Sequence, residues 1–270
     1  MQYDPIKKYL GNVFNKKPFL RKLFYKLLNI LLLRAWHIYR HIRAWAKDKK
    51  NEPLHILDAG SGFGQYTYTL SKMGKLWQIT AVDVKEEQVQ DCNQFFEKIG
   101  KGDRVKFYVE DLVTYQKPDT YHAILSVDVM EHILEDEKVF QNFAVSLKKG
   151  GKLFISTPSD QGGSDVHGES DSSFIEEHVR DGYNKEEITQ KILNAGFSKV
   201  DVMYSYGVPG KISWRFSMKY PILMLGKSKL FFIILPLYYL IFFPICLLLN
   251  FMDVRTKHRT GTGLIVIAEK

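Results

Sequence analysis

The chain has 270 residues, of which 45% are hydrophobic and 25% charged, a balance that is typical of globular proteins and excludes an intrinsically disordered chain. Its 38 Lys and Arg against 30 Asp and Glu give a net charge of +8, which favours an anionic partner, either a nucleic acid or an acidic lipid surface. The two cysteines, Cys92 and Cys246, stand far apart and exclude a disulfide framework, so we expect a reducing compartment. The first residues show no secretory-signal pattern.

Residues 1–50 form a basic zone that is rich in Leu, Tyr, Trp and Arg. From residue 19 the stretch FLRKLFYKLLNILLLRAWHIYRHIRAWAKDK has helical spacing and contains neither Gly nor Pro. This pattern predicts one long helix or two abutting helices that end before Pro53.

Short apolar runs then alternate with amphipathic stretches. We predict strands at 54–59, 78–84, 104–110, 121–128, 152–158, 199–206 and 263–270. Four helical patterns lie between these runs, and three of them end in a glycine at a plausible C-terminal cap: Gly100, Gly150 and Gly196. Strands that alternate with helices indicate an α/β fold with a mostly parallel sheet covered on both faces.

A glycine turn follows the first predicted strand, in ILDAGSGFGQYT. A nicotinamide-cofactor fingerprint would place its third glycine at Gln65, whereas the actual pattern is Asp58 with Gly60, Gly62 and Gly64. An acidic group at this strand end would repel a pyrophosphate, and would instead accept hydrogen bonds from an ammonium or hydroxyl group. The turn therefore predicts a ligand other than a dinucleotide.

Further carboxylates end the next two predicted strands. Asp83 ends AVD, where it is placed to accept from two ribose hydroxyls, and Asp111 in VEDL is placed to accept from an adenine amino group. Three carboxylates along the carboxyl edge of one parallel sheet line the crevice where such sheets bind ligands.

These motifs resemble those of the class I S-adenosylmethionine-dependent methyltransferases, notably the ubiquinone-pathway O-methyltransferases. The segments ILDAGSGFG, AVDV, VEDL, SVDVMEHI and KKGGKLFISTP occur in the order and spacing of that family, over residues 53–206 and the last strand. The resemblance implies a seven-stranded Rossmann-like sheet whose last strand inserts antiparallel beside the sixth. It also implies S-adenosylmethionine as the cofactor, bound by Asp58, Gly60, Gly62, Gly64, Asp83, Val84, Asp111, Leu112 and Val127.

Catalytic candidates follow the fourth strand and precede the last predicted helix of this region. They are Glu131 and His132 in SVDVMEHI, and His178 and Tyr183 in FIEEHVRDGYNKEEI. Three interpretations of His132 stay open. It is a general base, a ligand of a metal ion, or a residue that forms a hydrogen bond with the backbone at the start of the next helix. Asp128, Glu131, His132 and His178 also resemble the metal-binding set of small-RNA 2′-O-methyltransferases, with Asp in place of the first Glu. A divalent metal is the less favoured interpretation.

An uncharged apolar run extends from Leu230 to Met252, and by length alone it would span a bilayer. If the strands on either side of it are neighbours in one sheet, both ends lie on the same side of a membrane, which excludes a single crossing. Basic residues flank both ends, and Pro236 and Pro244 predict breaks into short helices. We expect a helical hairpin over 212–258 that dips into one leaflet, with the helix of residues 18–47 beside it.

The sequence therefore predicts three zones: N-terminal helices over 1–50, a methyltransferase domain over 51–206 and 259–270, and an apolar insertion over 207–258. The predicted partners are a lipophilic small-molecule acceptor and anionic lipid on the cytoplasmic face of a membrane, without nucleic acid. O-methylation is the leading expectation. N-methylation of a lipid head group and a non-catalytic membrane adaptor remain alternatives, as does burial of the run in a homo-oligomer.

Overall fold

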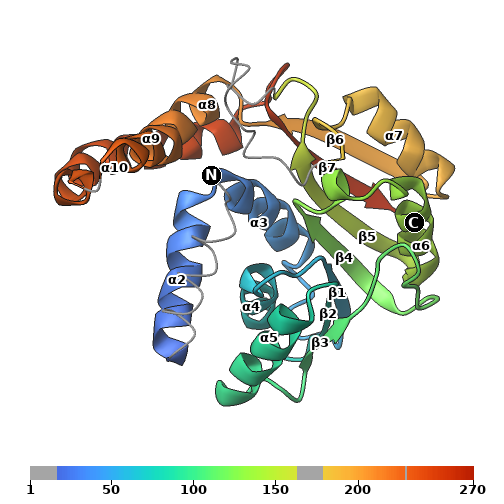
Figure 1. Ribbon diagram of the computed structural model, residues 1–270. Coiled ribbons are helices and arrows are strands. Elements are labelled where there is room, and N and C mark those ends of the chain that lie inside the picture. Colours follow the sequence, from blue (N-terminus) through green and yellow to red (C-terminus); the bar gives the residue numbers. More distant parts are fainter. Residues whose placement is uncertain (1–16, 163–178, 229) are drawn as a thin grey trace.

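A seven-stranded sheet forms the centre of the molecule in the computed structural model, which describes residues 17–162, 179–228 and 230–270 (Figure 1). The strand order is β3-β2-β1-β4-β5-β7-β6, and only β7 runs antiparallel to its neighbours. The strands are β1 (His55–Ala59), β2 (Gln78–Asp83), β3 (Val105–Val109), β4 (Tyr121–Val127), β5 (Leu147–Pro158), β6 (Lys199–Ser205) and β7 (Gly263–Glu269). The predicted fold class, including the antiparallel last strand beside the sixth, is confirmed.

Helices cover both faces of this sheet because successive strand residues point to opposite sides. Ile56 belongs to the core cluster on one face and Leu57 to the cluster on the other. The first face is covered by α3 (Leu33–Trp45), α4 (Gln65–Met73) and α5 (Glu86–Lys98), and the second by α6 (Asp136–Ser146) and α7 (Lys185–Asn194) (Figure 1).

Two of the three predicted glycine caps are confirmed. Gly100 and Gly196 follow α5 and α7 with φ of 67° and 101°, in the left-handed region that glycine adopts without strain. The prediction for Gly150 is wrong, because α6 already ends at Ser146 and β5 begins at Leu147. The backbone of Leu147 pairs with Tyr121 of β4, so the strand starts earlier than its apolar residues indicate.

The N-terminal zone contains two helices, α2 (Pro18–Leu31) and α3, with an extended residue, Leu32, between them. Within the described residues it is α3 that packs against the base of the apolar insertion, where His37 Nε2 and Asp253 Oδ1 lie 2.8 Å apart. The expectation that residues 18–47 lie beside the insertion as one unit is therefore wrong. The break at Leu32 turns α2 away, and its buried face, with Arg21 and Tyr25, packs on the loop before α4 instead.

The insertion is a helical hairpin that projects from the sheet, and we call it the arm (residues 208–255; Figure 1). Its first half comprises α8 (Val208–Trp214), a π-helical turn (Arg215–Lys219) and α9 (Tyr220–Lys227), and its second half is α10 (Phe231–Arg255). Ser213 Oγ donates to the Cys246 carbonyl, and Tyr239 Oη donates to the Ser217 carbonyl. The later residue of the first half, Ser217, thus contacts the earlier residue of the second half, Tyr239, so the two halves run antiparallel.

Pro236 and Pro244 do not break α10, so this part of the prediction is wrong. Each proline removes one backbone hydrogen bond, but side contacts with the first half of the arm hold the helix near both positions. The Phe242 ring stacks on Phe216 with centroids 5.0 Å apart, and Tyr238 Oη donates to the Phe216 carbonyl at 2.8 Å.

Candidate active site

The glycine loop, residues 60–64, connects β1 to α4 at the carboxyl edge of the sheet. All three of its glycines have positive φ, at 77°, 50° and 82°. A Cβ on Gly60 would lie 2.3 Å from Val129, and one on Gly64 would crowd Cys92 and Phe107 at 3.2 Å, so these two glycines are required by packing. A Cβ on Gly62 would meet nothing closer than 3.8 Å, which leaves the middle of the loop open to a ligand.

Asp83 holds this loop from the end of β2. Its Oδ2 accepts from the Gly62 N–H at 2.8 Å, and its Oδ1 accepts from the Lys85 N–H at 3.0 Å. The half-buried carboxylate therefore lies directly under the open position of the loop, with the exposed side chain of Val84 beside it. This position agrees with the predicted role of Asp83 in binding a nucleoside, which remains a prediction for both residues.

Asp58 lies beneath the loop rather than at its mouth. Its side chain is buried and accepts a hydrogen bond from the Thr67 hydroxyl of α4. Burial raises the pKa of Asp58 to about 7. Asp58 thus fixes the loop to the first turns of α4 in this structure, and a direct contact with a ligand stays a prediction.

The next two predicted cofactor positions lie along the same edge. Asp111 is exposed after β3, and its Oδ1 accepts from the Val113 N–H at 2.9 Å. Leu112 and Val127 are buried beside it and at the end of β4. The structure therefore brings the predicted carboxylates and apolar residues to one edge of the sheet. A buried Ser61 hydroxyl in the glycine loop has no hydrogen-bond partner among the described residues, as expected at a ligand site.

Asp128 begins the turn after β4 and carries a strained backbone, with φ of 53°. Its carboxylate forms an ion pair with Arg34 of α3, at 2.8 Å between Oδ2 and Nε. The backbone N–H of Arg34 donates to the Tyr206 hydroxyl at the end of β6. Backbone strain of this kind clusters at functional sites. Here the strained residue presents a half-exposed carboxylate at the carboxyl edge of the sheet. Neither Arg34 nor Tyr206 was predicted, because no local signal links them to Asp128.

Glu131 and His132 follow on the same turn but differ in exposure. Glu131 is buried, and its Oε2 accepts from the Thr157 hydroxyl at 3.0 Å. Burial, and then the nearby Asp128 carboxylate, raise the pKa of Glu131 to about 8, so this side chain is mainly protonated at neutral pH. His132 is exposed at the edge of the site.

Tyr183 lies in a buried polar cluster around Asp136. Its hydroxyl donates to Asp136 Oδ2 at 2.7 Å, and the same carboxylate binds Arg180 at 2.7 Å and Lys191 at 3.0 Å. Burial, and then the Asp136 carboxylate, hold the pKa of Tyr183 well above its usual value. The hydroxyl also donates to the Met130 carbonyl at 3.1 Å, so it joins the segment before α7 to the start of α6 and to the turn that carries Glu131 and His132.

The described residues contain no cluster of three or more His, Cys, Asp or Glu side chains able to hold a metal ion. Of the predicted metal set, Asp128 is paired with Arg34, and Glu131 is bonded to Thr157. His178, the fourth member and a predicted catalytic residue, lies outside the described residues.

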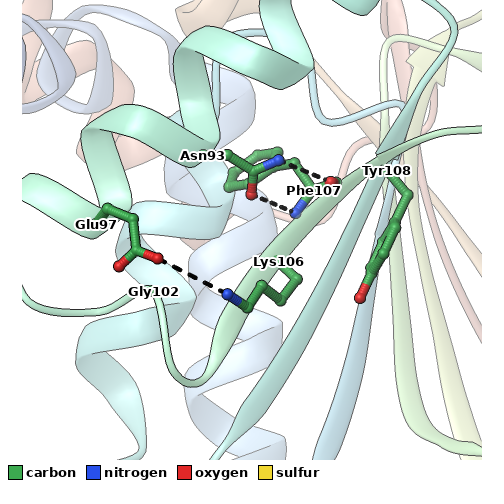
Figure 2. A pocket seen from close by; sticks show the side chains of 6 residues that line it. All are labelled: Asn93, Glu97, Gly102, Lys106, Phe107 and Tyr108. Atoms are coloured by element: carbon green, nitrogen blue, oxygen red, sulfur yellow. Dashed lines mark hydrogen bonds and ion pairs between the residues drawn. The ribbon is translucent and has the colours of Figure 1, made fainter.

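A shallow recess between α5 and β3 is distinct from this site (Figure 2). Asn93 spans it with two hydrogen bonds to the backbone of Phe107, and Lys106 faces Glu97 across its rim at 3.9 Å. It is lined by Gly102 and by residues 106–108 of β3, and none of the predicted cofactor positions lines it.

Part of the chain is similar to known methyltransferases. Residues 56–151 match the methyltransferase domain family. The ubiquinone biosynthesis O-methyltransferase of Xanthomonas euvesicatoria pv. vesicatoria is 28% identical over 138 residues, which cover 43% of this chain and 56% of that protein. The phosphoethanolamine N-methyltransferase of Triticum aestivum is 30% identical over 146 residues, which cover 54% of this chain and 28% of that protein.

A solved structure shares the fold. Phosphoethanolamine N-methyltransferase 2 of Haemonchus contortus, in complex with S-adenosyl-L-methionine, superimposes with a TM-score of 0.58 at 20% identity, covering 86% of this chain and 52% of that one. The chain thus spans about half, or less, of the length of these three proteins. The residues that match the family model include the glycine loop and Asp83 of the site described above.

Proposed function

Because the chain carries the domain of the class I S-adenosylmethionine-dependent methyltransferases, we propose that it methylates a lipophilic acceptor at a membrane surface. The family match confirms the predicted family and, with it, the predicted cofactor. The residues fit that cofactor: the loop is open at Gly62, the Asp83 carboxylate lies below it, and Asp111 stands at the next strand end. When bound, S-adenosylmethionine supplies a methyl group on a cationic sulfur that a lone pair of the acceptor displaces.

A lipophilic acceptor is supported by the position of the arm, which leaves the sheet at the same edge as the glycine loop. β6 runs parallel to β5, so Ser205 ends at the same carboxyl edge as the glycine loop, and Gly263 begins β7 there. The arm connects these two residues, and apolar side chains along it are exposed: Ile233 is 78% and Leu240 is 73% exposed. An apolar surface at the mouth of a site suits an acceptor drawn from a bilayer.

The charge pattern of the arm supports insertion into one leaflet. Within the described residues, α10 is the one helix long and apolar enough to cross a membrane. The paired register of Ser205 with Gly263 keeps both ends of the arm on one side, so α10 does not cross alone. If the arm stood perpendicular to the bilayer plane, Lys227 near its tip would enter the hydrocarbon core, which costs about 3 kcal/mol. We propose instead that the arm lies in the interface, with its basic side chains at head-group level.

His132 is the proposed proton acceptor. Of the catalytic candidates within the described residues, it alone has an exposed side chain, whereas Glu131 and Tyr183 are buried. Its task is to take the proton that the acceptor oxygen or nitrogen loses as the new bond to the methyl carbon forms. O-methylation of a hydroxyl is the leading chemistry. The carboxylate of Asp128 near the same turn favours an ammonium head group as the second candidate.

We expect His132→Ala to lower methyl transfer about 100-fold or more while the affinity for S-adenosylhomocysteine stays unchanged. The assay follows labelled methyl groups from the cofactor into a total membrane lipid extract, with mass spectrometry to separate O-methyl from N-methyl products. His122→Ala is the matched control, because His122 lies near the start of β4, whereas His132 lies on the turn that follows the carboxyl end of this strand. Unchanged turnover in His132→Ala would remove this residue from the mechanism, and failure of the wild type to bind S-adenosylhomocysteine would remove the function.

A further inference from the structure

The inner face of α2 is bonded to the backbone of the glycine loop. Arg21 Nη2 donates to the Phe63 carbonyl at 2.9 Å, and the Tyr25 hydroxyl donates to the same oxygen. Phe63 stands between Gly62 and Gly64, so these bonds act on the part of the loop that faces the ligand. Arg21 is 3% exposed, and its guanidinium also pairs with Asp91 of α5. A buried charge of this kind is retained only where its partners are fixed.

The outer face of α2 is apolar and exposed. Phe19, Leu23 and Leu27 follow one another at intervals of four residues, which places them on one side of the helix, and they are 71%, 39% and 43% exposed. At 3.6 residues per turn, Arg21 lies roughly 200° around the helix from Phe19, on the opposite side. The segment PFLRKLFYKLLNIL contains no acidic residue, and the exposed Lys22 and Lys26 border the apolar stripe.

Within the described residues α2 is fixed through its inner face, where the Tyr25 ring packs against Phe95 of α5 and Asn29 donates to Thr69 of α4. Leu32 is extended between α2 and α3, and a helix of 14 residues is marginally stable without a packed partner. Figure 1 shows α2 outside α4 and α5, on the side of the sheet away from α6 and α7. The inner face thus links the position of α2 to the Phe63 carbonyl, so a surface that binds the outer face acts on the glycine loop through the same helix.

We infer that α2 couples the membrane surface to the cofactor site: its outer face binds an anionic bilayer, and the bound helix holds the glycine loop in its ligand-binding form. This inference rests on the proposed function and adds regulation to it. The occupant is an anionic lipid surface, because an apolar stripe bordered by lysines and free of acidic residues is the pattern of a helix that lies in such an interface. Linkage is reciprocal, so the cofactor product also strengthens binding of the bilayer.

The test is calorimetric titration of the full chain with S-adenosylhomocysteine, alone and with vesicles of phosphatidylcholine or of phosphatidylcholine with phosphatidylglycerol. We expect anionic vesicles to lower the Kd about 10-fold for the wild type, and neutral vesicles to have a much smaller effect. The double variant Leu23→Ser/Leu27→Ser should keep the wild-type Kd without vesicles and lose the tightening, while the arm still carries it into the vesicle pellet.

Leu193→Ser is the matched control, because Leu193 of α7 is also 39% exposed but lies on the other face of the sheet, and it should behave as the wild type. Arg21→Met should weaken binding and remove the vesicle effect, with its thermal midpoint measured to confirm folding. An equal Kd with and without vesicles in wild-type protein that pellets would overturn the inference, as would tightening that survives in the double variant. Absence of any S-adenosylhomocysteine binding would instead reject the proposed function.

Discussion

Replacement of Asp83 by alanine is expected to weaken S-adenosylhomocysteine binding by about 100-fold or more. The carboxylate accepts from the Gly62 and Lys85 backbone N–H groups, and hydrogen bonds to a charged group contribute roughly 1.5–3 kcal/mol each. The variant loses these bonds and the proposed contact with the ribose, so the open position of the loop is no longer held in place. Isothermal titration measures the affinity directly.

The control for this experiment is Asp103→Ala, an exposed acidic residue in the turn before β3, away from the glycine loop. It removes the same charge and should leave the affinity unchanged. Thermal denaturation without ligand separates lost binding from lost folding. An Asp83→Ala protein that folds and binds within about threefold of the wild type would show that the carboxyl edge is not organised by this residue.

Two charges on the arm are expected to abolish membrane binding. Ile233 and Leu240 are among the most exposed side chains of α10, so Ile233→Asp/Leu240→Asp should leave the fold intact. Each substitution loses about 2 kcal/mol of apolar burial in the bilayer and adds a charge that the interface disfavours. We expect partition into vesicles, measured by sedimentation, to fall by at least about 100-fold.

The wild-type protein in the same experiment distinguishes a membrane from a second copy of the chain as the partner of the arm. Leu134→Asp is the control, because Leu134 is 75% exposed but lies near the start of α6. If the arm were a dimer interface, wild-type protein would migrate as a clean dimer without detergent and would not pellet with vesicles. That result would contradict the membrane account and would favour the homo-oligomer.

The strands of the sheet could be predicted because the signals that mark each strand lie within a few residues of it in the sequence. Each strand is a short apolar run, and each is bounded by a glycine, a proline or a carboxylate that marks the edge. The resemblance then supplied the antiparallel last strand beside the sixth, whereas the full strand order, with β7 between β5 and β6, comes from the structure. The same locality explains why Asp83 and Asp111 could be placed at the carboxyl edge from the ends of their strands.

Contacts between distant segments could not be predicted in this way. Arg34 and Asp128 meet only because α3 packs over the end of β4, and Arg21 reaches Phe63 only because the chain turns at Leu32. From sequence alone, a buried polar side chain such as Arg21 is predicted to lie on the surface, because no neighbouring residue indicates its partners.

Two local signals also gave the wrong expectation, because tertiary contacts overrode them. Pro236 and Pro244 disrupt an isolated helix, yet α10 continues through both where the first half of the arm supports it. Gly150 has the left-handed backbone of a helix cap, with φ of 77°, but pairing of β5 with β4 has already begun before it. Propensity thus indicates what a segment prefers, and packing decides which preference is expressed.

The central claim is that the arm lies in one leaflet, on the same side as the cofactor site. Ser228, at the tip between α9 and α10, offers a direct test as Ser228→Cys. Cys92 and Cys246 are both buried, and burial raises the pKa of both thiols, so the new cysteine is the reactive one among the described residues.

The measurement is labelling of this variant, bound to sealed vesicles, with a membrane-impermeant maleimide. An arm in the interface predicts labelling when the reagent is added outside, where the catalytic domain is, and none when it is trapped inside. Labelling from the inside alone would mean that the tip has crossed the bilayer, and would contradict the account.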